Sequence, residues 1–108
     1  MEIIEGAKKT HGFIVVQRKM GESVFIGENY KITAIRLDMG FAFLDVTNLK
    51  DKKVTPVSMA KGERHEGFED FNIVLTHIRD RQVSIGIEAP YETKILREEL
   101  LLREMLND

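Results

Sequence analysis

The chain has 108 residues and a mass of 12.4 kDa, which fits a single domain with one modest core. It contains no cysteine, so disulfide scaffolds, thiolate metal sites and cysteine nucleophiles are excluded together. The formal net charge of −2 and the sequence pI of about 5.9 mean that the chain as a whole has no excess of positive charge with which to bind nucleic acid. No apolar run approaches the roughly 20 residues of a membrane span, and the N-terminus lacks a signal-peptide pattern. We therefore expect a cytoplasmic protein without a membrane partner.

The first half of the chain is predicted to be rich in strands. Residues 1–12 are expected to be an N-terminal extension, and strand-like patterns begin at Phe13. Short runs of β-branched and aromatic residues, bounded by glycine-containing turns, are typical of strands. In this half the runs cover residues 13–16, 23–26, 30–37 and 41–46.

The second half begins with a polar, charge-rich stretch. Residues 47–69 are expected to be a long connection, with one short helical turn near residues 57–60. Strand patterns return at residues 71–78 and 82–88, and the latter run has the clearest period-two alternation of the chain. A last strand is expected over residues 91–95. A helix is expected over residues 96–106, where Glu98 and Glu99 complement the helix dipole. The expected fold is mainly β with one C-terminal α-helix, in a small barrel or sandwich.

An internal echo links the two halves. Residues 28–46 match residues 69–87 at a constant offset of 41 positions, so that Tyr30 aligns with Phe71 and Ile32 with Ile73. Identity is low, and convergent hairpin patterning is the alternative explanation. A matching register over both hairpins nevertheless indicates a duplicated strand pair.

Enzymatic chemistry finds no support in the sequence. The three histidines show no ligand spacing, the scattered carboxylates form no motif, and no glycine-rich loop resembles a phosphate-binding site. We therefore expect no enzymatic activity, no metal and no cofactor.

Basic side chains at strand ends are the remaining candidates for function. Arg18 and Lys19 end the first predicted strand. Arg97 ends the last, on the face that it would share with Thr93 and Ile95 if the strand alternates regularly. Arginine offers a rigid fork of donors that matches a guanine edge or a phosphate. On these patterns alone, solvated charges that protect sheet edges are the favoured interpretation.

Two separated blocks of the sequence resemble the carbon storage regulator (CsrA/RsmA) family. Residues 14–27, IVVQRKMGESVFIG, are similar to the family's opening strand, basic pair, Gly-Glu and second strand. Residues 82–90, QVSIGIEAP, are similar to its fourth strand and Ala-Pro break, and residues 91–100 to its fifth strand and helix start. The blocks occur in the family's order, which makes the resemblance specific.

The resemblance covers about residues 13–46 and 69–105. It implies a single CsrA-like domain over residues 13–108, with an insertion of about 41 residues between roughly 28 and 69. It also implies a homodimer of interleaved strands, in which the first strand of one protomer lies beside the last strand of the other.

From the same resemblance we expect an RNA-binding post-transcriptional regulator that recognises GGA motifs in hairpin loops of mRNA leaders and affects translation or mRNA stability. Unstacked loop bases expose their edges, so a few side chains suffice to read them, which fits an acidic pI. Arg97 would be the principal reader, and Arg18 and Lys19 would contact phosphates or base edges. The expected RNA-binding set is completed by Val16, Gln17, Thr93 and Ile95.

The sequence also departs from the family pattern. Threonine is usual at the position of Gln17, an apolar residue at that of Thr93, and often histidine at that of Leu96. The insertion is the largest departure, because it could shield or extend the RNA-binding face. The alternative function is therefore a β-fold protein-interaction or antagonist module that has lost RNA affinity, with a protein regulator as its partner.

Overall fold

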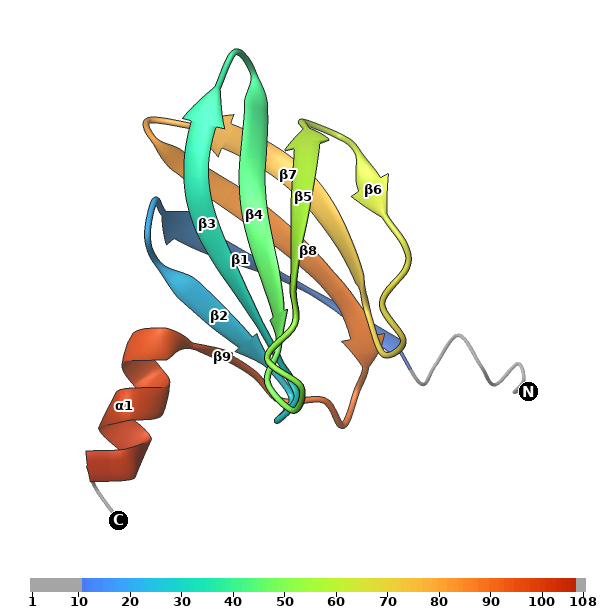
Figure 1. Ribbon diagram of the computed structural model, residues 1–108, viewed down its shortest axis with the longest axis vertical. Coiled ribbons are helices and arrows are strands. Elements are labelled where there is room, and N and C mark those ends of the chain that lie inside the picture. The colour runs from blue at the N-terminus through green and yellow to red at the C-terminus, as the bar shows by residue number, and fades with distance from the viewer. Residues whose placement is uncertain (1–10, 107–108) are drawn as a thin grey trace.

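The computed structural model describes residues 11–106, which form nine strands and one helix (Figure 1). The strands are β1 (His11–Lys19), β2 (Ser23–Ile26), β3 (Tyr30–Asp38), β4 (Phe41–Asn48), β5 (Val54–Ala60), β6 (Arg64–His65), β7 (Asn72–Arg79), β8 (Gln82–Pro90) and β9 (Ile95–Arg97). The helix α1 (Glu98–Leu106) follows β9 directly and projects from the edge of the strands (Figure 1). The expected content, mainly strands with one C-terminal helix, is confirmed.

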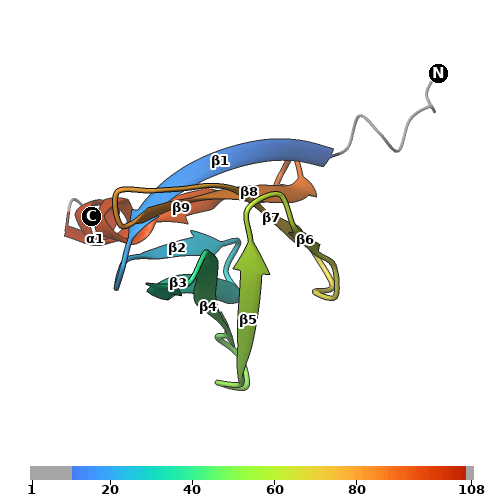
Figure 2. The same cartoon turned by 90° about the horizontal axis from the view of Figure 1, so that it is seen from above.

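The strands form two antiparallel sheets that pack against each other and do not close into a barrel (Figure 2). Sheet A has the order β1-β8-β7-β6, and sheet B has the order β5-β4-β3-β2-β9. Of the barrel and the sandwich expected from the sequence, the sandwich is therefore the one observed. Apolar side chains from both inner faces fill the space between the sheets, among them Ile32, Leu44, Ile73 and Ile85.

The two long hairpins, β3–β4 and β7–β8, share their irregularities. Each turns through two residues with positive φ, 39–40 in one and 80–81 in the other, as tight two-residue hairpin turns do. Each ladder also has one register shift, after Ala34 in the first and after Leu75 in the second. All of these features recur at the offset of 41 residues, so the duplicated strand pair predicted from the sequence is present in the fold.

The repeat also includes the strand that precedes each hairpin. β1 pairs with β8 so that Val16 lies opposite Ile85, and β5 pairs with β4 so that Val57 lies opposite Leu44. Val16 and Val57 are 41 residues apart, and so are Leu44 and Ile85. The fold therefore contains two repeats, β1–β4 and β5–β8, and each repeat contributes its first strand to the sheet of the other.

The prediction for residues 47–69 was wrong. This segment contains β5 and β6, and residues 57–60 belong to a strand instead of a helical turn. In β5, buried Val57 and Met59 alternate with exposed Pro56 and Ser58. The proline is tolerated because β5 is an edge strand of sheet B. The segment 28–69, expected as an insertion, contributes strands to both sheets.

The predicted boundaries at both ends also need correction. Residues 91–93 form a turn and bend closed by a hydrogen bond from the Thr93 backbone N to the Pro90 backbone O at 2.9 Å, so the last strand is not residues 91–95 but β9. The helix begins at Glu98 instead of residue 96. β1 begins at His11, inside the expected extension, and residues 1–10 lie outside the described residues.

Candidate functional site

A groove of about 500 Å³ lies where β1 approaches β9 and the start of α1. We refer to it as the Arg97 groove. β1 is an edge strand of sheet A and β9 is an edge strand of sheet B, so the groove lies along one side of the sandwich. Its walls are formed by Val15, Val16, Gln17 and Ser84 of sheet A and by Ile95, Arg97 and Leu100.

Four of the seven residues predicted to bind RNA line this groove: Val16, Gln17, Ile95 and Arg97. The alternation along β1 turns Gln17 and Lys19 outward and turns Val16 and Arg18 inward. Lys19 is therefore exposed on the same side of β1 as Gln17, just beyond the groove residues. The fold thus brings β1 and β9 of the same chain together at one surface, whereas the family resemblance had placed the two strands on different protomers.

Arg18 is buried, with only 3% of its surface exposed. Its Nη1 and Nη2 donate to the two carboxylate oxygens of Glu99, each at 2.9 Å. Nη1 also donates to the backbone O of Ser23 at 3.1 Å, and Nε donates to the backbone O of Gln17 at 2.6 Å. The guanidinium is therefore engaged inside the protein, where it holds α1 against β1.

Glu99 is shared by two arginines. Besides its bidentate pair with Arg18, its Oε2 lies 3.7 Å from Nε of Arg97. The hydrogen bonds from Arg18 lower the pKa of Glu99 to about 2, and the same bonds raise the pKa of Arg18 above its ordinary value. Because Glu99 belongs to the first turn of α1 and Arg97 ends β9, this carboxylate positions both elements relative to β1.

Arg97 is the one cationic side chain among the described residues that line the groove. About half of its side chain is exposed (48%), and its contact with Glu99 is too long for a strong hydrogen bond. β9 holds its backbone in place, because Arg97 lies opposite Val24 in the ladder with β2. Apolar Ile95 and Leu100 flank it. A fork of donors beside apolar surface is suited to bind an unstacked base or a phosphate.

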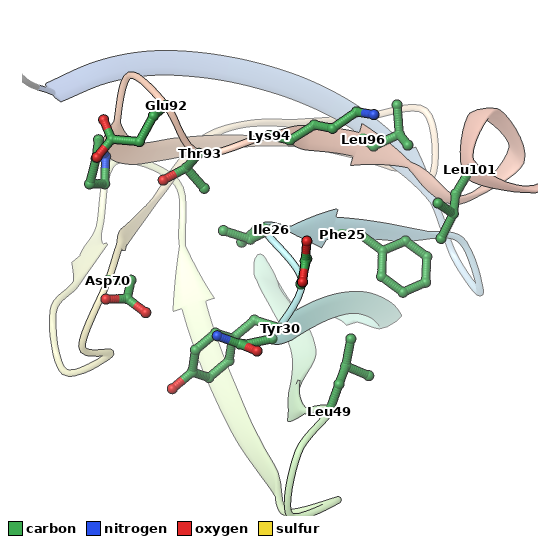
Figure 3. Close-up of a pocket in the computed structure, with 14 residues that line it drawn as sticks. Phe25, Ile26, Tyr30, Leu49, Asp70, Glu92, Thr93, Lys94, Leu96 and Leu101 are labelled. Atoms are coloured by element: carbon green, nitrogen blue, oxygen red, sulfur yellow. The ribbon is translucent and has the colours of Figure 1, made fainter. Parts of the chain in front are cut away.

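A larger cavity, of about 720 Å³, lies between the turn after β2 and the loop before β9 (Figure 3). Thr93, predicted to bind RNA, lines this cavity and not the Arg97 groove. The carboxylates of Glu28, Asp70 and Glu92 also line it. Lys94 lines it as well, so these side chains carry three negative charges against one positive charge, which opposes an anionic ligand. For a phosphate-bearing ligand the smaller Arg97 groove is therefore the better candidate.

The sequence did not indicate three of the groove residues. Ser84 lies opposite Gln17 in the ladder of β1 and β8, and this register could not be read from either strand alone. Val15 and Leu100 are apolar residues whose patterns resemble those of ordinary strand and helix faces. Only the sheet pairing and the start of α1 bring all three together.

The described residues offer little support for other kinds of site. Within residues 11–106, no group of three or more histidine, aspartate or glutamate side chains comes together in a way that could hold a metal ion. The helix in this range is too short and too polar to cross a membrane.

Comparison with known proteins gives one match. Residues 68–105 match the model of the CsrA family, described as the Global regulator protein family. The matched segment contains β7, β8, β9 and most of α1, and so includes Ile95 and Arg97. The block of residues 14–27 lies outside it. No curated protein and no solved structure matches the chain.

Proposed function

From the match of residues 68–105 to the CsrA family model, and from the resemblance to the RNA-binding regulators of that family, we propose that this protein binds GGA motifs in hairpin loops of mRNA leaders. Through this binding it affects translation or mRNA stability as a post-transcriptional regulator. The proposed action is binding alone, without a catalytic step or a cofactor. Messenger RNA as the target places this action in the cytoplasm.

The observation that carries the proposal is the half-exposed guanidinium of Arg97 in a groove with both polar and apolar walls. A bidentate arginine matches O6 and N7 of guanine, and the loop of an RNA hairpin displays these atoms because its bases are unstacked. The reading of a few bases does not require a large basic surface. The proposal is therefore compatible with a net charge of −2.

The geometry suggests different roles for the predicted residues. Arg97 reads the guanines, and Gln17 and Lys19 offer donors on the outward side of β1 to base edges and phosphates. Val16 and Ile95 supply apolar contacts. Arg18 acts as a positioning residue through Glu99, and Thr93 lies outside the proposed contact set.

The test is a binding titration over a series of salt concentrations, with an RNA hairpin that carries GGA in its loop. The matched control is the same hairpin with the loop changed to CCA. We expect tight binding that the control loses, because base edges and not only phosphates are read. Equal and weak binding to both hairpins that vanishes at moderate salt would overturn the proposal. The protein-interaction module would then be the remaining function.

A further inference from the structure

The two repeats create a second groove at the position equivalent to the Arg97 groove. This groove has a volume of about 360 Å³, and we refer to it as the Phe43 groove. Four of its lining residues stand 41 positions from four lining residues of the Arg97 groove. The equivalent pairs are Pro56 and Val15, Val57 and Val16, Ser58 and Gln17, and Phe43 and Ser84.

The Phe43 groove lacks one wall, because the first repeat has no counterpart of β9 and α1. After the second repeat, the chain continues from β8 into β9 and α1. After the first repeat, β4 ends at Asn48 and β5 begins at Val54, so only residues 49–53 separate them. Sheet B accordingly continues from β2 to β9, whereas sheet A ends at the equivalent strand β6.

The Phe43 groove also lacks the donors of the Arg97 groove. At the equivalent positions of β5, Met59 replaces Arg18 and Ala60 replaces Lys19. The guanidinium of Arg36 lies 4.2 Å from the ring centroid of Phe43, where a cation–π contact engages it. The carboxylate of Asp45 lines the same groove. Neither the wall nor the chemistry of an RNA-binding site is therefore present.

The complete groove, in contrast, is built within one chain. Its walls come from β1, which begins the first repeat, and from β9 and α1, which follow the second repeat. β1 pairs with β8 and β9 pairs with β2 of the same molecule. The first and last strands, which the family resemblance placed on different protomers, thus meet without a second copy.

We propose that a single chain forms one complete RNA-binding site and no second one, so that the protein acts as a monomer that binds one GGA hairpin. This inference rests on the proposed function and adds the stoichiometry of binding to it. The protein therefore cannot bridge two motifs on one RNA, as a molecule with two equivalent sites can.

The first test is native mass spectrometry of the full chain, alone and with an excess of the GGA hairpin. We expect the free protein at the mass of one chain and a complex of one chain with one RNA. A complex of two chains, or of one chain with two hairpins, would overturn the inference and leave the proposed function standing. A monomer that forms no complex with the hairpin would overturn both.

A pair of matched variants gives a second test. Gln17 and Ser58 occupy equivalent positions, and both are exposed on edge strands. We expect Gln17→Ala to weaken hairpin binding roughly fivefold, as the loss of one hydrogen bond does, and Ser58→Ala to leave the affinity unchanged. A similar loss in both variants would show that the Phe43 groove also binds RNA and would overturn the inference.

Discussion

The two repeats share their strand order and pairing but have different outer surfaces. The turns that follow β1 and β5 are equivalent: Gly21 and Gly62 have φ angles of 90° and 88°. Glu22 and Glu63 each accept a hydrogen bond from the backbone N–H three residues earlier, at 2.8 and 2.7 Å. The glycine and the glutamate that shape these two turns are thus the same in both repeats.

The two repeats differ mainly in the side chains that point away from the shared core. Most inward positions are apolar in both, as at Ile32 and Ile73, because both repeats pack into one interior, and Arg18 is an exception that Met59 replaces in the second repeat. Outward positions diverge, as at Lys19 and Ala60. Packing in the core therefore restricts the side chains of both repeats in the same way. The contacts of the Arg97 groove restrict the outward side chains of β1, in the first repeat, and not those of β5.

The largest expected effect tests whether the two repeats contribute equally to the stability of the core. Ile32 and Ile73 are both fully buried, at equivalent positions. We expect Ile32→Ala and Ile73→Ala each to lower the free energy of unfolding by about 2–5 kcal/mol, because each leaves a cavity between the sheets. Denaturant unfolding measures this loss. A loss below about 1 kcal/mol in only one of them would show that the core does not depend equally on both repeats.

The next effect tests whether the outer surfaces of the two repeats differ because of RNA binding at the Arg97 groove. We expect Arg97→Ala to weaken binding of the GGA hairpin by about 1–3 kcal/mol, because a bidentate contact with guanine is lost. Fluorescence titration measures the affinity. Arg79→Ala removes the same charge at an exposed position of β7 and should have little effect. Unchanged affinity of a folded Arg97→Ala variant would remove Arg97 from the site.

A third prediction concerns Arg18→Met, which gives the first repeat the residue type that the second has at Met59. We expect the free energy of unfolding to change by less than about 1.5 kcal/mol, because an apolar side chain of similar length can fill the buried site of Arg18 and the half-exposed Glu99 remains hydrated. The start of α1 should lose its contact with β1, so that its amide hydrogens exchange faster. Hairpin affinity should also fall, but by less than in Arg97→Ala. Unchanged exchange in α1 would contradict the positioning role of Arg18. Arg103→Met, in an exposed part of the same helix, is the control.

The smallest effect is a pH dependence of the ion pair between Arg18 and Glu99, which has no counterpart at Met59 of the second repeat. The pKa of Glu99 is about 2 in the folded protein, against an ordinary value of 4.5. A lowered folded-state pKa means that the stabilisation is fully present above pH 4.5 and is lost as the pH falls through about 2. NMR titration of the Glu99 side-chain carboxyl carbon should give this low midpoint in the native protein. The midpoint should rise toward 4.5 in Arg18→Met, and a native midpoint near 4.5 would contradict the ion pair.

Much of the fold was predictable, because most strands carry period-two patterns and lie between turn residues. β5 was missed because Pro56 and its polar neighbours interrupt the pattern when the segment is read alone. The offset of 41 residues from Val16 to Val57 does carry the signal, once the repeat is extended to the strand before each hairpin. The shortness of β9 was not predictable, because three residues contain too little pattern.

The position of the candidate site was predictable from the sequence, but the contacts between its residues were not. The alternation from Val16 places Arg18 on the inner side of β1. A charge at such a position requires a partner, and that partner, Glu99, lies 81 positions further along the chain. Glu99 was interpreted only as a charge at a helix start. No local pattern links the two residues, so their contact depends on the pairing of the sheets.

The pairing of β1 with β8 and of β9 with β2 has a consequence for how the protein responds to dilution. Sheets that are completed by a second molecule come apart as the protein concentration falls, by mass action. Here the partner strands belong to one covalent chain, so the midpoint of unfolding should be the same at any concentration. In the proposed monomer a substitution occurs once in the folded particle and not twice, so one face of the sandwich can change without altering the other.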